Sequence, residues 1–205
     1  VVSWNGLISG YVEYSDDENA IRCFNQMQCE DIPWDAVTLV SILKCCGCNM
    51  GDTHKVQEIH MWICKLGFYK DTIVGNSLIH GYAKCGLLSN AQDVFDNLPV
   101  RDTVLWNALI SGYSACNQEN EASNCFEHMQ IEGVSPDITT YACILKLFGN
   151  VGAIQKGREI HREVVNRGLL GKDIVLGNAV VDMYAKCGIM TKAQNVLQEL
   201  PVRDV

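Results

Sequence analysis

The chain has 205 residues, of which 48% are hydrophobic and 20% are charged, and its formal net charge is −8. This share of apolar residues supports a packed core and excludes an intrinsically disordered chain. No apolar run approaches the roughly 18 residues of a membrane-spanning helix. The acidic balance argues against broad, non-specific binding of nucleic acid, which requires a basic surface to neutralise phosphates.

Eleven cysteines are present, an odd number scattered through helical patterns, which is not typical of a disulfide scaffold. We expect reduced thiols that are mostly buried as small core residues. The cluster of Cys45, Cys46 and Cys48, followed by His54 and His60, offers a single two-residue spacing and no matching second pair. A zinc site is therefore not predicted.

The sequence repeats itself after 102 residues, as the step from Trp4 to Trp106 illustrates. Three blocks carry most of the identity, namely 2–11 with 104–113, 82–86 with 184–188, and 98–102 with 200–204. Such self-similarity indicates a repeat architecture.

A shorter period lies inside each 102-residue unit. Aspartates close six segments of 35, 36, 31, 35, 36 and 31 residues. We expect each segment to form one helical hairpin. The closing residues are Asp35, Asp71, Asp102, Asp137, Asp173 and Asp204.

Apolar residues spaced at helical intervals predict two helices in the first segment. Leu7 and Tyr11 belong to the apolar stripe of the first helix, and Ala20 and Phe24 to that of the second. Residues 15–18 read Ser-Asp-Asp-Glu, a capping box that predicts the start of the second helix at the serine.

Glycine and proline mark the predicted helix ends in the later segments. Gly86 and its counterpart Gly188 fall between the two helices of their segments, where a left-handed cap favours glycine. All four prolines lie within three residues of a closing aspartate, where they should stop the second helix; they are Pro33, Pro99, Pro136 and Pro201.

A single hairpin cannot bury both of its apolar faces, so neighbouring hairpins should stack into a continuous core. The sequence therefore predicts an all-α solenoid. Tetratricopeptide repeats are the main competitor, but their Trp-x-x-Leu-Gly pattern is absent and their constant 34-residue period does not match the alternating segment lengths.

Several strings closely resemble plant pentatricopeptide-repeat proteins, and more narrowly the subclass that alternates P, L and S repeats. They are Val-Val-Ser-Trp-Asn-Gly-Leu-Ile-Ser-Gly-Tyr (1–11), Gln-Glu-Ile-His (57–60), Leu-Pro-Val-Arg-Asp (98–102) and Gly-Asn-Ala-Val-Val-Asp-Met-Tyr-Ala-Lys-Cys-Gly (177–188). The resemblance implies a right-handed superhelical solenoid, related to that of tetratricopeptide repeats. It assigns P-like repeats to 1–35 and 103–137, L-like repeats to 36–71 and 138–173, and S-like repeats to 72–102 and 174–204.

The resemblance also implies sequence-specific binding of single-stranded RNA in a mitochondrion or chloroplast, with selection of sites for C-to-U editing. A deaminase would act in trans or on a C-terminal extension. Fragments of a zinc-deaminase signature, at His161–Glu163 and Cys45–Cys48, stand in the wrong order, and we interpret both as coincidence. We expect no catalytic site, metal or cofactor here, and we expect any targeting segment to lie outside the stretch from Val1 to Val205.

In the family, the fifth residue of a repeat and its last residue read one base together. An asparagine amide offers a donor and an acceptor to a base edge, whereas an aspartate only accepts and can orient the amide. By resemblance this combination prefers uracil over cytosine. The alternative is that these asparagines cap helices. The predicted pairs are Asn5/Asp35, Asn76/Asp102, Asn107/Asp137 and Asn178/Asp204.

The L-like repeats have Val40 and Ala142 at the fifth position, which cannot hydrogen-bond a base, and we interpret these repeats as spacers. Aliphatic residues stand at the second position of the other four repeats, where family members insert a side chain between bases. An equally acceptable alternative is packing between helices. These residues are Val2, Ile73, Val104 and Val175.

Lys84 and Lys186 are predicted to contact phosphate, with ordinary solvated lysines as the alternative. Trp4 and Trp106 are expected to pack in the core rather than stack on bases. His60 and His161 are expected to be packing residues. An interaction scaffold for another protein remains the second function hypothesis, and the acidic balance favours it.

Overall fold

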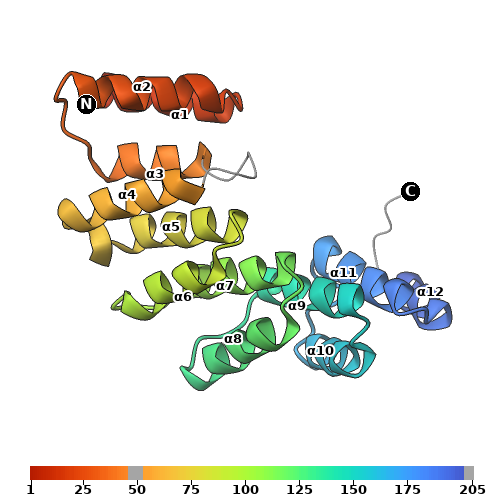
Figure 1. Cartoon of the computed structure of the whole chain (residues 1–205). Coiled ribbons are helices and arrows are strands. Elements are labelled where there is room, and N and C mark those ends of the chain that lie inside the picture. The colour runs from red at the N-terminus through yellow and green to blue at the C-terminus, as the bar shows by residue number, and fades with distance from the viewer. Residues whose placement is uncertain (46–52, 201–205) are drawn as a thin grey trace. The chain divides into compact units, whose positions relative to one another are not determined.

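The computed structural model describes residues 1–45 and 53–200, and within these ranges every regular element is helical. The chain divides into two compact units, Val1–Arg101 and Asp102–Val205 (Figure 1). The prediction of an all-α stack of helical hairpins is confirmed.

The first unit contains six α-helices and one short 3₁₀ helix in its described part. They are α1 (Val2–Glu13), α2 (Asp17–Cys29), α3 (Ala36–Cys45), α4 (Thr53–Lys65), η1 (Phe68–Lys70), α5 (Thr72–Lys84) and α6 (Leu88–Asn97).

The second unit has the same order without a 3₁₀ helix in the part that the structure describes. Its helices are α7 (Thr103–Ala115), α8 (Glu119–Ile131), α9 (Ile138–Val151), α10 (Ile154–Asn166), α11 (Ile174–Lys186) and α12 (Met190–Glu199).

Within each unit, the first helices of successive hairpins pack side by side. In the first unit α3 contacts both α1 and α5, and in the second unit α9 contacts both α7 and α11. Where another hairpin follows within the unit, the second helix packs on its own first helix and on the first helix of that next hairpin, as α2 does on α1 and α3. The first helices therefore form one layer of each unit, and this layer carries the candidate site.

The buried residues follow the helical stripes. Ile8, Ala20 and Phe24 are at most 1% exposed. Leu7, which belongs to the same predicted stripe, is 46% exposed, whereas its counterpart Leu109 in the second unit is 0% exposed.

The predicted capping box at residues 15–18 is displaced by one residue. Asp16 is the N-cap of α2 and accepts a hydrogen bond from the backbone amide of Asn19 at 3.3 Å. Ser15 has φ +58° and makes the left-handed turn that ends α1. Because that turn fixes its backbone, Ser15 is not available as the cap.

Gly86 and Gly188 occupy the equivalent turn with φ of +73° and +76°, so the prediction of left-handed glycines is confirmed. The first hairpin of each unit has Ser15 or Asn117 there instead. Proline positions are confirmed as well, since Pro33, Pro99 and Pro136 follow the ends of α2, α6 and α8; Pro201 lies outside the described residues.

One histidine–tyrosine contact joins each 36-residue segment to the next. His60 Nδ1 lies 2.7 Å from the Tyr82 hydroxyl, and His161 Nδ1 lies 3.0 Å from the Tyr184 hydroxyl. In both, the histidine of a second helix packs edge-to-face on the tyrosine of the following first helix. This confirms the packing role predicted for His60 and His161.

The described cysteines are free thiols, but few of them are buried. Cys45 and Cys125 are buried, whereas Cys29, Cys64 and Cys116 are exposed and the remaining four are half-buried. The expectation of mostly buried thiols was wrong, because these residues lie at the borders of the helical apolar stripes rather than at their centres.

No group of three or more His, Cys, Asp or Glu side chains in the described ranges is arranged to hold a metal ion. Cys46 and Cys48 of the sequence cluster lie outside those ranges. None of the described helices has both the length and the apolar composition to cross a membrane.

Candidate nucleic-acid interface

The aliphatic residues predicted to separate bases protrude from the first helices. Val2 is 86% exposed, Ile73 70%, Val104 57% and Val175 58%. Each lies in the first turn of its helix. An exposed aliphatic side chain gains little from packing between helices, so the packing alternative does not account for these four positions.

The first predicted pair is joined by a compact polar network. The Asn5 amide nitrogen donates to both carboxylate oxygens of Asp35, at 2.9 and 3.0 Å. The Thr38 hydroxyl lies 2.6 Å from the Asn5 amide oxygen and 3.0 Å from Asp35 Oδ1. Because a carboxylate can only accept, the nitrogen of the amide must face it. The contacts therefore fix the orientation of the Asn5 amide.

The second unit reproduces this network. The Asn107 amide nitrogen donates to both oxygens of Asp137 at 3.1 and 3.2 Å. The Thr140 hydroxyl lies 2.6 Å from the Asn107 amide oxygen and 3.0 Å from Asp137 Oδ1. The structure thus brings together two of the four predicted pairs, each between neighbouring first helices.

The same contacts keep both aspartates ionised. Burial by itself would raise the pKa of Asp35, but the Thr38 backbone amide and the Asn5 side chain donate to the carboxylate and hold its pKa below the usual value. The corresponding groups lower the pKa of Asp137. Each pair therefore presents a charged carboxylate behind an oriented amide.

The closing aspartates have a structural role that was not predicted from the sequence, because each of the five that the structure describes caps the following first helix. Asp137 forms a reciprocal capping box with Thr140. The asparagines lie inside their helices, so the interpretation of these asparagines as caps is wrong. Side chains that accept from the amides of the next helix are those of Asp35, Asp71, Asp102, Asp137 and Asp173.

The remaining two pairs are described only in part. Asn76 is half-buried on α5 of the first unit, whereas Asp102 caps α7 in the second unit and accepts from Leu105. Asn178 is exposed on α11, and its partner Asp204 lies outside the described residues. These pairs stay predictions.

The apolar fifth residue of the segment 138–173 borders a shallow hollow. Ala142 of α9 and the closing Asp173 both contribute to it, and its volume is about 310 Å³. Lys146 and the protruding Val175 complete its rim. The hollow lies between α9 and α11. Val40, at the same position in the first unit, is half-buried.

The two lysines lie in the last turns of α5 and α11, and both are exposed. Lys84 Nζ is 3.5 Å from the backbone oxygen of Lys44. Lys186 forms an ion pair with Asp182 at 2.7 Å, so part of its charge is neutralised locally. Trp106 is 3% exposed, which confirms its predicted packing, and Trp4 is half-buried.

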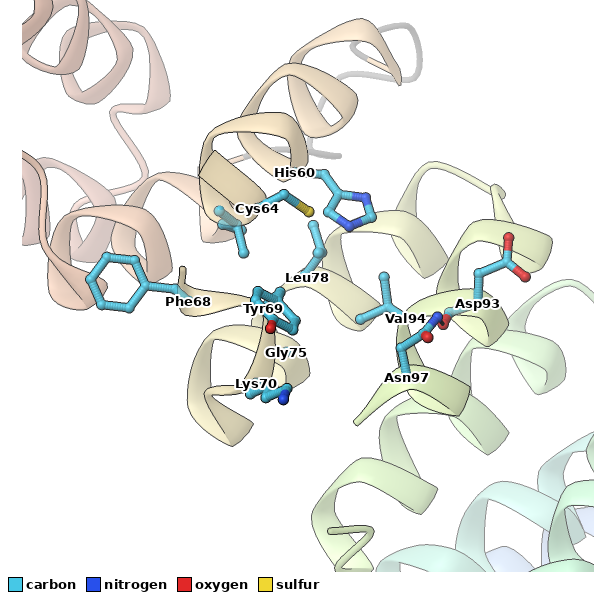
Figure 2. A pocket seen from close by; sticks show the side chains of 11 residues that line it. His60, Cys64, Phe68, Tyr69, Lys70, Gly75, Leu78, Asp93, Val94 and Asn97 are labelled. Carbon is cyan, nitrogen blue, oxygen red and sulfur yellow. Dashed lines mark hydrogen bonds between the residues drawn. The ribbon is translucent and has the colours of Figure 1, made fainter. Parts of the chain in front are cut away.

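A deeper hollow of about 320 Å³ was not anticipated from the sequence (Figure 2). It lies in the first unit between α4, η1, α5 and α6. Gly75 and Leu78 line it together with Val94, and His60 and Lys70 contribute polar groups. The helical patterns could not reveal it, because its residues come from two segments, 36–71 and 72–102, and share no motif.

The sequence matches two related family models. The PPR repeat family model covers residues 1–49 and 101–150, and a PPR repeat model covers residues 76–102. Together they cover more than half of the chain, which belongs to the pentatricopeptide-repeat family.

Among curated proteins, a pentatricopeptide repeat-containing protein of Arabidopsis thaliana is 34% identical over 188 residues, covering 92% of this chain and 27% of the relative. A second Arabidopsis relative, named a putative mitochondrial pentatricopeptide repeat-containing protein, is 32% identical over 207 residues, covering 99% of this chain and 32% of its own length. The chain therefore spans about a third or less of these two relatives.

Among solved structures, PPR10 in complex with an 18-nt psaJ RNA element has a TM-score of 0.77 at 22% identity, covering 96% of this chain and 29% of that one. Maize PPR10 by itself gives a TM-score of 0.71 at 20% identity, covering 99% and 30%. This likeness establishes the shared fold.

Proposed function

We propose that this stretch of repeats binds single-stranded RNA and reads one base per repeat. The observation that carries the proposal is the duplicated network in which Asn5 faces Asp35 and Asn107 faces Asp137. A structural cap needs no asparagine from the neighbouring helix. An oriented amide backed by a charged carboxylate is suited to the edge of an exposed base.

The four protruding aliphatic residues support the same proposal. Val2, Ile73, Val104 and Val175 stand near the reading positions with more than half of their surface exposed. Base faces are apolar, and contact with such side chains would separate consecutive bases and hold each edge against its pair. Lys84 and Lys186 would meet the phosphates of the same strand.

The proposed reading rule gives uracil at the first, third, fourth and sixth bases, with the second and fifth unassigned. The RNA would run 5′ to 3′ from the N-terminus of the chain. This rule treats the asparagine pairs of all four P-like and S-like repeats as equivalent, and the L-like repeats as spacers.

Measurement of binding to short RNAs tests the proposal. The protein should bind 5′-UAUUAU-3′ more tightly than the same RNA with cytosine at the first and fourth positions. Asn5→Ala combined with Asn107→Ala should remove the difference, while circular dichroism confirms an intact fold. Equal binding of the two RNAs by the unaltered protein would sink the proposal.

We further propose that the chain belongs to the subclass with alternating P, L and S repeats, and that it selects sites for C-to-U editing in a mitochondrion or chloroplast. The alternating segment lengths and the relatives named as mitochondrial support this. A deaminase would supply the chemistry, in trans or on another part of the protein. Sequencing of organelle transcripts from plants lacking the protein should reveal an unconverted cytidine next to a site that fits the rule.

A protein-interaction scaffold is the second candidate, and the net charge of −8 favours it. It predicts no difference between the two RNAs. The same binding experiment therefore distinguishes the two functions.

A further inference from the structure

Two threonine hydroxyls are placed where three other first helices of the chain have apolar side chains. Thr38 and Thr140 are the third residues of their segments and are both 0% exposed. The corresponding residues of the other described first helices that follow a closing aspartate are Val74, Leu105 and Leu176, also 0% exposed. A buried hydroxyl is unfavourable unless it is hydrogen-bonded, so the difference calls for a physical reason.

The hydrogen bonds supply that reason. Each hydroxyl has one hydrogen, and its shortest contact, 2.6 Å in both units, is to the amide oxygen of Asn5 or Asn107. Each hydroxyl also accepts from the backbone amide of the closing aspartate, at 3.3 Å for Asp35 and 3.1 Å for Asp137. One threonine therefore holds both members of a pair.

The contacts leave part of the hydrogen-bonding capacity of the amide unused. The Asn5 nitrogen uses one hydrogen on the carboxylate and keeps the other, and the oxygen keeps one lone pair after accepting from Thr38. The remaining donor and acceptor have fixed directions because the amide is held at both ends. Without the hydroxyl, only the carboxylate would restrain it.

We propose that Thr38 and Thr140 are positioning residues that set the base preference of the preceding repeat, at the first and fourth bases. The inference rests on the proposed function, because it concerns how the asparagine pairs read RNA. Threonine at the start of one repeat would thus act on the base read by the repeat before it. The segment that closes at Asp102 is followed by Leu105 in place of a threonine, so it should distinguish uracil from cytosine less sharply.

Two substitutions distinguish the effect of the hydroxyl from the effect of the side-chain shape. Thr140→Val keeps the branched shape and removes the hydroxyl, whereas Thr140→Ser keeps the hydroxyl and removes a methyl group. Thr191→Val is the matched control, because this threonine is exposed on the second helix α12. Urea unfolding of all variants measures the purely structural effect.

The readout is the dissociation constant for the RNA with cytosine at the fourth position divided by that for 5′-UAUUAU-3′, so that a preference for uracil gives a ratio above 1. We expect Thr140→Val to lower this ratio about fivefold, the change that one hydrogen bond typically supplies. Thr140→Ser and Thr191→Val should keep the wild-type ratio. The ratio for cytosine at the first position should not change in any of them, because Thr38 is intact.

Three outcomes would overturn the inference. If Thr140→Val keeps the preference while Asn107→Ala loses it, the reading pair is real and the threonine does not position it. If the preference for uracil at the fourth base decreases in proportion to the free energy of unfolding, and Thr140→Ser loses as much of it as Thr140→Val, the threonine acts through stability alone. If the unaltered protein has no preference, the proposed function is wrong and the inference falls with it.

Discussion

At the scale of single residues, the paired asparagines and aspartates are held by contacts that leave little freedom. Asn5 is 8% exposed, and each polar atom of its side chain has a partner within 3.0 Å. An amide restrained in this way can distinguish hydrogen-bonding patterns that a mobile side chain would accept equally. Base specificity at these positions should therefore respond to small changes of chemistry.

Replacement of Asn107 by threonine should move the preference at the fourth base from uracil toward guanine. The shorter side chain leaves room for a purine, and the Asp137 carboxylate can accept from the amino or imino hydrogens of guanine. Binding to RNAs with each of the four bases at this position measures the change. The first base, read by Asn5, serves as the internal control, and an unchanged fourth-base preference would show that Asn107 does not read RNA.

Backbone conformation at the ends of second helices gives a separate prediction. Asp31 has φ +51°, whereas its counterpart 102 residues later is Gly133 with φ +77°. A left-handed backbone is unfavourable for residues with a Cβ atom. Asp31→Gly should therefore stabilise the protein by about 0.5 to 1 kcal/mol, and Gly133→Asp should destabilise it by a similar amount. Urea unfolding measures both; loss of stability in Asp31→Gly would contradict the argument.

At the scale of helices, the sequence predicted the hairpins because periodic signals mark them. The regular aspartates, the glycines at 86 and 188 and the prolines all punctuate helix ends. Errors occurred where one residue could serve two purposes. Ser15 had the pattern of a cap, but the end of α1 required it in a left-handed turn. The roles of Thr38 and Thr140 were missed, because a threonine in the first turn of a helix gives no signal until its neighbours in space are known.

Helices α4 and α5, and likewise α10 and α11, are joined by histidine–tyrosine contacts that should make stability depend on pH. Burial lowers the pKa of His60 and of His161. The unfolded chain therefore binds more protons than the folded one as pH falls below about 6.5, the usual histidine pKa. The contribution of the two histidines to the free energy of unfolding is fully present above that pH and is lost as pH falls through the folded-state pKa values.

Urea midpoints measured between pH 7.5 and pH 5 should decrease accordingly. The double variant His60→Gln, His161→Gln should have a lower midpoint at pH 7.5, because its tyrosines lose their partners, and a weaker dependence on pH. His54, whose side chain is exposed, provides the control substitution His54→Gln. A decrease of the same size in the double variant and in the wild type would assign the pH dependence to other groups.

At the scale of the whole molecule, the net charge of −8 limits the electrostatic contribution to RNA binding. Lys84 and Lys186 are the proposed phosphate contacts, and Lys186 is already paired with Asp182. Each neutralised phosphate of a single strand contributes about −0.7 to the slope of log affinity against log salt concentration. With two lysines, the slope should be no steeper than about −1.5. Titrations at several salt concentrations measure it.

Lys84→Gln should make this slope shallower by about 0.7 and should weaken binding equally for all RNA sequences. A steep slope that is independent of sequence would instead indicate a phosphate-binding surface that the acidic composition does not lead one to expect. Affinity at physiological salt should be modest, because base contacts and stacking must supply most of it.

The duplication of a 102-residue unit bears on how such a protein changes over generations. Its two units have the same succession of hairpins, and Trp4 and Trp106 occupy equivalent positions near their starts. A crossover between the two copies in the coding sequence would add or remove one complete unit without shifting the reading frame. By the proposed rule, the recognised RNA would then grow or shrink by three nucleotides in one event. A target sequence could thus be lengthened in steps, while single substitutions at the asparagine positions adjust individual bases.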